Sequence, residues 1–190
     1  MKKLALFLCI GAFLASCSRN YTPKPHAYFR IDFPVKHFET FRSECPFEFE
    51  KPLYSEVRRD SSANSEPCWL NMNFLPYNAT LHLTYKPIGE EFNLLDLQND
   101  TRRFVMNHTI KAQEIIENKI DKPDEHVHGV LYHLTGNTAT SLQFYVTDSS
   151  NHYLRGALYF NTNTNPDSIA PVLNYITDDV IQLIGTLKWN

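Results

Sequence analysis

The sequence has few of the residues on which several common kinds of site depend. Only 6 of its 190 residues are glycine, which leaves little material for a glycine-rich loop around phosphate groups. Neither the Gly-x-Ser-x-Gly elbow of hydrolases nor the His-Glu-x-x-His motif of zinc peptidases occurs in the chain. No pair of carboxylates stands out by its spacing. We therefore predict a protein that is not an enzyme and has no cofactor.

The sequence also lacks a block of basic residues. Its formal net charge is −3, and this becomes −5 (−3 minus 2) if Lys2 and Lys3 are removed with a leader. A mildly acidic chain of this kind is poorly suited to binding nucleic acid. Apart from Leu4–Ala15, no stretch is apolar enough to be considered for membrane insertion. We predict that the rest of the chain lies in water and has no nucleic-acid partner.

The N-terminal stretch has the layout of a bacterial export signal. Two lysines precede the apolar run Leu4–Ala15, which is too short to span a bilayer, because a span takes roughly 20 residues. The run ends in Ala15-Ser16-Cys17, which resembles the lipobox of bacterial lipoproteins. The resemblance implies that residues 1–16 are a cleaved signal peptide and that Cys17 carries acyl chains such as palmitate, which anchor stably when two or more are present. The alternative is an ordinary secretory signal with an incidental cysteine.

Residues 17–27 are predicted to form a lipidated, extended tether. Pro23 and Pro25 disfavour a helix there and extend the chain. The remainder, residues 28–190, shows no repeat, long linker or internal boundary. Its length suits a single globular domain with a substantial core.

The four cysteines divide into two groups. Cys9 would leave with the signal peptide and Cys17 would be lipidated, so Cys45 and Cys68 remain. Two cysteines in an exported protein indicate one disulfide, and closing a loop of this size contributes roughly 3 kcal/mol. The alternative is a pair of buried free thiols. A metal site is disfavoured, because neither cysteine belongs to a closely spaced pair of ligands.

Alternation of apolar and polar residues predicts a mostly antiparallel sheet. A first strand is expected at residues 28–33, ended by Pro34. Residues 69–76 and 79–86 are expected to pair as a hairpin. Residues 112–120 fit either a strand or an extension of a helix. Further strands are predicted within 45–52, 53–59, 126–136, 138–148 and 152–161.

Helical spacing of apolar residues occurs twice. Asn93 is predicted to cap a helix over about 94–111. A second, C-terminal helix is predicted to start from a cap at Asp167 or Ser168, with Pro171 in its first turn. Its apolar stripe, which should pack on the sheet, consists of Ile169, Val172, Leu173, Ile176, Val180, Leu183, Ile184 and Leu187. The predicted fold class is therefore α+β, a mostly antiparallel sheet packed by a mid-chain helix and a long C-terminal helix.

Two acidic stretches of the C-terminal helix have a structural and a functional interpretation. Asp178 and Asp179 lie mid-helix, and we expect them on its solvated face. Asp167-Ser168-Ile169 resembles the short acceptor of the Bacteroidota O-glycosylation system. The same residues serve equally well as a helix cap, which is the interpretation we favour.

Histidines and tyrosines raise two further possibilities. His126 and His128, two apart on an expected strand, are the residues considered as metal ligands, with a third ligand needed from His82 or Glu125. We favour an exposed strand start there and predict no metal. Three tyrosines of the later strands fit either of two roles. They could line a surface that binds carbohydrate or peptide, or they could form a core beneath a helix, and we favour the core. These are Tyr132, Tyr145 and Tyr153.

Several stretches together resemble one known family. They are "NYTPKPHAYFRIDFP" after the lipobox, "CPFEFEKP", "CWLNMNF" and the closing "YLRGALYFNTNTNPDSIAPVLNYITDDVIQLIGTLKW". Over essentially the whole mature chain they resemble the GldD gliding-motility lipoproteins of Bacteroidota. The resemblance implies a component of the gliding machinery, associated with the type IX secretion system and without an assigned reaction. It also implies a fold similar to the PsbP/Mog1-like α/β/α sandwich, which says nothing about chemistry.

Given this resemblance, the residues that follow the lipid cysteine help to predict where the protein is located. Surface lipoproteins of this phylum often carry an acidic export signal there, whereas this chain has Ser18-Arg19-Asn20. We expect a lipid-anchored envelope protein on the outer membrane, facing the periplasm. The expected function is a non-catalytic component or assembly factor whose partners are the membrane and other gliding or type IX secretion proteins. The alternative is a ligand- or carbohydrate-binding lipoprotein with an aromatic pocket.

Overall fold

The computed structural model of the protein describes residues 31–162 and 166–190. The predicted signal peptide (1–16), the tether (17–27) and the lipidation site Cys17 lie outside the described residues. Within the described part of the chain, no helix combines the length and the apolar character needed to cross a membrane.

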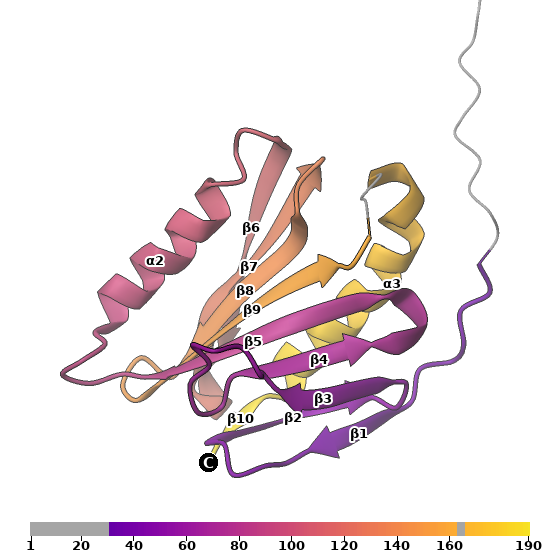
Figure 1. Ribbon diagram of the computed structural model, residues 1–190. Helices are drawn as coiled ribbons and strands as arrows, with labels where there is room; N and C mark the ends of the chain where they lie inside the picture. Colours follow the sequence, from indigo (N-terminus) through magenta and orange to yellow (C-terminus); the bar gives the residue numbers. More distant parts are fainter. Residues whose placement is uncertain (1–30, 163–165) are drawn as a thin grey trace, which may run out of the picture.

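A seven-stranded antiparallel sheet forms the centre of the fold (Figure 1). Its order is β3-β4-β5-β9-β8-β7-β6. The β4–β5 pair is the predicted hairpin. Residues 112–120, which fitted either a strand or an extension of a helix, belong to a strand, β6. The strands are β3 (Ser55–Arg59), β4 (Leu70–Phe74), β5 (Ala79–Pro87), β6 (Ala112–Lys122), β7 (Val127–Gly136), β8 (Thr140–Thr147) and β9 (His152–Phe160). Short 3-10 turns, η1 (Leu75–Tyr77) and η2 (Pro123–Glu125), precede β5 and β7.

A smaller, three-stranded antiparallel sheet has the order β1-β2-β10. Its strands are β1 (Phe38–Phe41), β2 (Phe47–Pro52) and β10 (Lys188–Trp189). The strand predicted at residues 28–33 is wrong over residues 31–33, which form no strand, and residues 28–30 lie outside the described part of the chain. The partner of β2 is β1, further along the chain. Alternation alone misled the prediction, since the ring of Phe33 stacks on a helix residue, Tyr175, and does not belong to a sheet face.

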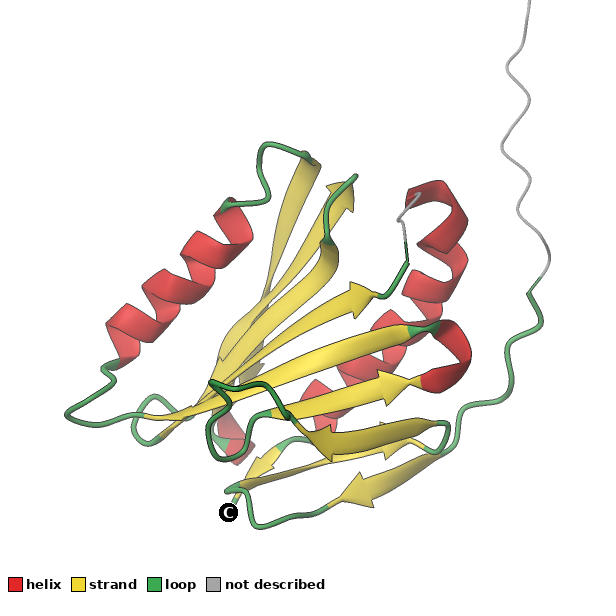
Figure 2. Cartoon of the chain, in the orientation of Figure 1, coloured by secondary structure: helices red, strands yellow, loops and turns green. Residues whose placement is uncertain are grey.

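Two long helices lie on opposite faces of the large sheet (Figure 2). On one face lies α2 (Leu94–Met106), which ends earlier than predicted. Asn93 caps it as predicted, because its side-chain oxygen accepts a hydrogen bond from the Asp96 N–H at 2.9 Å. The layers are therefore helix, sheet and helix, in agreement with the predicted α+β class.

The helix on the other face is α3 (Pro166–Thr186). It starts one residue before Asp167, so the caps predicted at Asp167 or Ser168 are wrong, and Pro171 lies in the second turn. Proline is favoured at a first helical position because its missing N–H needs no partner there. The predicted apolar stripe is confirmed, since Ile176, Val180 and Leu183 are fully buried in the main core.

The main core lies between α3 and both sheets. The pattern in β4 shows why these strands form, since Leu70, Met72 and Phe74 are buried while Asn71 and Asn73 alternate with them toward the other face. Phe47 and Phe49 of β2 complete the core from the small sheet. A disulfide joins Cys45, just before β2, to Cys68, just before β4, with 5.5 Å between their Cα atoms. It ties the small sheet to the large one.

Candidate functional site

Residues 33–36, here called the docking segment, hold the start of the described chain against α3. The ring of Phe33 stacks on that of Tyr175, with 4.3 Å between the ring centroids. The Tyr175 hydroxyl donates a hydrogen bond to the carbonyl oxygen of Pro34 at 2.8 Å. The proline cannot continue a strand ladder because it has no N–H, and here its carbonyl group serves the helix contact. The chain is thus fastened to α3 soon after the predicted tether.

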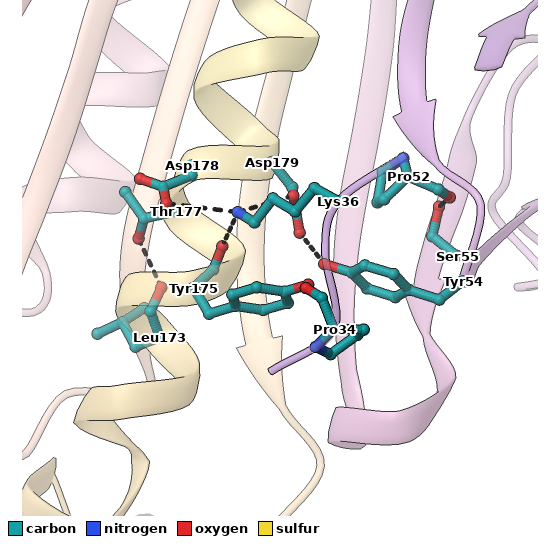
Figure 3. Close-up of polar contacts among 10 residues, drawn as sticks. All are labelled: Pro34, Lys36, Pro52, Tyr54, Ser55, Leu173, Tyr175, Thr177, Asp178 and Asp179. Carbon is teal, nitrogen blue, oxygen red and sulfur yellow. Dashed lines mark hydrogen bonds and ion pairs between the residues drawn. The ribbon is translucent and has the colours of Figure 1, made fainter. Parts of the chain in front are cut away.

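Lys36 makes the polar contacts of this attachment (Figure 3). Its Nζ donates to the main-chain carbonyl of Tyr175 at 2.5 Å and lies 4.2 Å from the centroid of that ring. The same Nζ lies 3.0 Å from Oδ1 of Asp179 and 3.4 Å from Oδ2 of Asp178. Only 17% of the Lys36 side chain is exposed, so this ammonium group is largely removed from water. Its contacts replace the hydration that it loses.

Asp179 is the buried member of the site, with an exposed side-chain fraction of 0%. Tyr54, in the turn between β2 and β3, donates its hydroxyl to Oδ2 of Asp179. Burial raises the pKa of Asp179 above its usual range, and the contacts from Tyr54 and Lys36 partly oppose that shift. Burial also raises the pKa of Tyr54, and the neighbouring Asp179 carboxylate adds to the effect. Three separate chain segments therefore meet at one carboxylate.

The prediction that Asp178 and Asp179 both lie on a solvated face is wrong for Asp179. Asp178 is 71% exposed, as expected, but its neighbour points toward the docking segment. A signal was present in the sequence, because Asp179 follows Ile176 by three residues and precedes Leu183 by four. It therefore belongs to the apolar stripe. A carboxylate at such a position needs a buried partner, which helical spacing cannot identify.

Aromatic rings surround this ion pair. Tyr54 stacks at 5.9 Å from Tyr175, and Tyr77 meets both rings edge-on at 5.6 Å. Phe33 lies 6.0 Å from Tyr77. Burial raises the pKa of Tyr77 as well. The cluster joins the docking segment, the β2–β3 turn, the η1 turn and α3 into one attachment. Its aromatic rings and charged groups hold one another in place.

The histidines considered as metal ligands are not brought together. His126 is not part of β7, because it ends the η2 turn with a left-handed backbone, φ 54°. His128 does belong to β7, and its Nδ1 lies 2.9 Å from Oδ1 of Asp121. His82 contacts Asn71 on β4 instead. Across residues 31–162 and 166–190, no three His, Cys, Asp or Glu side chains are grouped as metal ligands would be.

The three tyrosines that fit either a binding surface or a core lie beneath α2. Tyr132 and Tyr153 are buried, and Tyr153 stacks on Tyr145 at 5.3 Å. The Tyr153 hydroxyl lies 2.7 Å from that of Thr101 on α2. Burial raises the pKa of Tyr132 to about 12. These side chains form core and do not line an open aromatic pocket.

Comparison with known families decides where this chain belongs. The sequence model of the family described as gliding motility lipoprotein GldD matches residues 18–189. The chain belongs to that family. The match includes the docking segment, Tyr54 and Asp179, so the attachment site lies within the part that the GldD family shares. The predicted family is thereby confirmed. A search of curated proteins found no match.

A solved structure supports the fold. The solution structure of cyanobacterial PsbP (CyanoP) from Synechocystis sp. PCC 6803 is similar with a TM-score of 0.50 and 13% sequence identity. The similarity covers 83% of this GldD-family chain and 95% of the cyanobacterial chain. At this identity it shows the fold alone, and it confirms the predicted PsbP-like architecture.

Proposed function

We propose that this GldD-family lipoprotein is a non-catalytic component or assembly factor of the gliding-motility and type IX secretion machinery. Membership of the family over residues 18–189 is the observation that carries the proposal. In this proposal acyl chains on Cys17 anchor the protein to the outer membrane, and residues 28–190 form one domain that faces the periplasm. Its partners are the membrane and other envelope proteins of that machinery.

The docking segment gives the anchor a mechanical role in this proposal. Phe33 is the sixteenth residue after Cys17. A fully extended chain of that length reaches about 55 Å, so the domain stays within that distance of the membrane. A pull on the anchor is transmitted through Phe33 and Lys36, whose contacts are on α3. The load therefore enters the main core and bypasses the small strand β1.

The contacts at the docking segment also favour a non-catalytic role. The Asp179 carboxylate is already engaged by Lys36 and Tyr54, and its side chain is fully buried. A catalytic carboxylate has to reach a substrate, within hydrogen-bond distance or through one water. This buried carboxylate, whose pKa burial raises, therefore stabilises an attachment.

A crosslinking pull-down from cell envelopes tests the proposed role. The bait is a functional tagged chain that retains Cys17. The matched control carries Cys17→Ala behind an ordinary cleavable secretory leader, so that it is exported without acyl chains. We expect the lipidated bait to recover other gliding or type IX secretion proteins, and the control to leave the membrane fraction. The proposal is wrong if the control complements a deletion as well as the lipidated chain, or if the bait recovers none of these proteins.

A further inference from the structure

Strand β6 is an open edge of the large sheet. It is the outermost strand at the end farthest from β3 (Figure 1), and among the described residues only β7 pairs with it. Within the same ranges, no main-chain hydrogen bond reaches residues 113–122 from the other side. The two long helices pack mainly on other strands, α2 on β8 and β9, and α3 on β2 and β8. The outer N–H and C=O groups of β6 are therefore available to another strand.

This edge has little of what usually prevents edge strands from pairing. Natural edges are commonly short, bulged or interrupted by proline. Strand β6 has 11 residues, whereas the mean strand has about 5 to 6. Its irregularity lies at the very start, between Ala112 and Glu114, and Pro123 comes only after its last residue. Residues 114–122 thus form an uninterrupted edge.

The charges along β6 are complementary to a second, antiparallel copy of the same strand. In a twofold arrangement centred on Asn118, this residue faces Asn118 of the second copy. Glu117 then faces Lys119 of the second copy, and Glu114 faces Lys122. The symmetry makes each of these pairs occur twice. Opposite charges in facing positions stabilise an antiparallel pair, and like charges destabilise it.

Within one chain these charges have only weak or exposed partners. Glu117 lies 3.9 Å from Arg102 of α2, and both side chains are exposed. Lys119 lies 2.5 Å from Asp121 two residues further along β6, and both are exposed as well. Exposed ion pairs of this kind contribute little to stability. The side chains of Glu117 and Lys119 can therefore turn to a facing strand at small cost.

The apolar residues of β6 agree with the same register. Ile120 packs against the main core on the α3 side, and Ile116 shares that face because the two are four apart on a strand. Centred on Asn118, Ile116 faces Ile120 of the second copy. Ile116 is 43% exposed in the single chain, and this pairing would cover it. Ile115 faces Asp121, but it already packs against the cluster beneath α2.

Neighbouring registers lose the agreement. When the pairing is centred on Glu117, this glutamate faces itself. When it is centred on Lys119, the lysine faces itself and Glu117 faces Asp121. Centres farther along the strand shorten the ladder or include the bulge after Ala112. The length of the edge and the order of its charges therefore favour the register centred on Asn118.

We propose that β6 is a docking surface for a second copy of this chain, so that the two large sheets join antiparallel around Asn118. The twofold axis stands perpendicular to the sheet, which places both α2 helices on one side of the joined sheet and both α3 helices on the other. The docking segment takes no part in this contact. The inference goes beyond the role proposed above and does not depend on it.

A cysteine at the twofold position tests the pairing in the full-length chain. In Asn118→Cys the two thiols face each other, because facing residues of an antiparallel ladder have Cα atoms about 4.5 to 5.5 Å apart, within disulfide range. Cell envelopes are oxidised briefly with copper phenanthroline, and the tagged chain is followed on non-reducing gels. We expect a disulfide-linked dimer.

The matched control is Glu114→Cys, an exposed position on the same strand. Its two thiols would lie about 26 Å apart in the proposed register, so this variant should stay monomeric. The wild-type chain shows what the native cysteines contribute. Absence of the Asn118→Cys dimer, or an equal yield from Glu114→Cys, would overturn the proposal. A disulfide from Asn118→Cys to a different protein would mean that another partner covers this edge, and would overturn self-pairing as well.

Charge reversal separates specific pairing from a loss of folding. In the Asn118→Cys chain, Glu117→Lys sets two lysines against each other, and Lys119→Glu sets two glutamates against each other. Each change should lower the dimer yield about fivefold or more, because two like-charge pairs replace two opposite ones. Coexpression of the two variants with different tags restores opposite charges at both positions, so a mixed dimer should form in preference to either homodimer. A mixed dimer no more abundant than the homodimers would refute the register.

Discussion

Buried charge is handled differently on the two faces of the large sheet. On the α3 side, Lys36 and Asp179 lie 3.0 Å apart, and Tyr54 satisfies the second carboxylate oxygen. On the α2 side, Arg155 has one hydrogen bond to Gln143, an aromatic neighbour and no acidic partner among the described residues. Both sites join elements that are distant in sequence. Among the described residues, only the first site pairs its cation with a carboxylate.

The difference separates a closed ion pair from a half-buried cation that is paired with no carboxylate among the described residues. An ion pair closed off from water is costly to break, because removing one partner leaves the other charge buried without a counter-charge. It therefore suits a permanent attachment, such as the docking segment on α3. On the α2 side, removing Arg155 leaves no described carboxylate without its counter-charge. Variants on the two faces should therefore behave differently, and their effects can be ordered by size.

The largest loss is expected from Asp179→Asn. The change leaves the buried Lys36 ammonium without its main counter-charge, and breaking such a pair costs about 3 to 5 kcal/mol of unfolding free energy. Urea unfolding monitored by circular dichroism measures it. The matched control is Asp178→Asn, which alters a 71% exposed neighbour and should change stability by less than about 0.5 kcal/mol. Equal effects of the two substitutions would contradict the importance of burial.

The next effect depends on pH. Lys36→Met removes the cation beside Asp179, whose pKa burial already raises. With a raised pKa the folded state binds the proton more tightly than the unfolded state, so the variant recovers stability as the pH falls through that pKa. We expect the difference from the wild type to be largest at neutral pH and to shrink in mild acid. The control Lys119→Met, at an exposed position, should show little change at any pH.

A smaller loss is expected from Tyr54→Phe. It removes one hydrogen bond to the buried Asp179 carboxylate and keeps the ring in its stack with Tyr175, which should cost about 2 kcal/mol. Thermal unfolding gives the comparison. Tyr145→Phe is the control, because its hydroxyl has only a 3.4 Å contact from Gln98. A loss as small as that of the control would mean that Tyr54 contributes only packing.

The smallest effect is expected from Arg155→Met on the other face. The variant removes an uncompensated cation and strands no opposite charge, so the unfolding free energy should stay within about 1 kcal/mol of the wild type, in either direction. Chemical denaturation is the measurement. A loss comparable to that of Asp179→Asn would show that Arg155 has a structural role, and would end the distinction between the two faces.

Most of the fold could be predicted from the sequence because it depends on local periodicity. Alternation predicted the β4–β5 hairpin, and helical spacing with Asn93 predicted the start of α2. The stripe of α3 was predicted as well. The strand expected at residues 28–33 was wrong over its described part, residues 31–33, because a short alternating run cannot reveal that Phe33 packs on a helix. The two-residue strand β10 is too short to give a pattern.

The sites were harder to predict because they join distant residues. Lys36 and Asp179 are far apart in the chain, and no sequence pattern near either residue indicates that the two form an ion pair. The position of Asp179 on the apolar stripe indicated a buried carboxylate but not its partner. Arg155 lies in an alternating strand, where an arginine would be expected at the surface. Its burial depends on how far α2 extends across the sheet.

A double-mutant cycle between Lys36→Met and Asp179→Asn tests the central claim most directly. If the two side chains form one closed ion pair that fastens the docking segment to α3, each single variant loses stability. The double variant then loses no more than the worse single one, which gives a coupling energy of about 2 kcal/mol or more. Strictly additive losses, with a coupling energy near zero, would show that the two residues act independently and that the docking segment is not held by this pair.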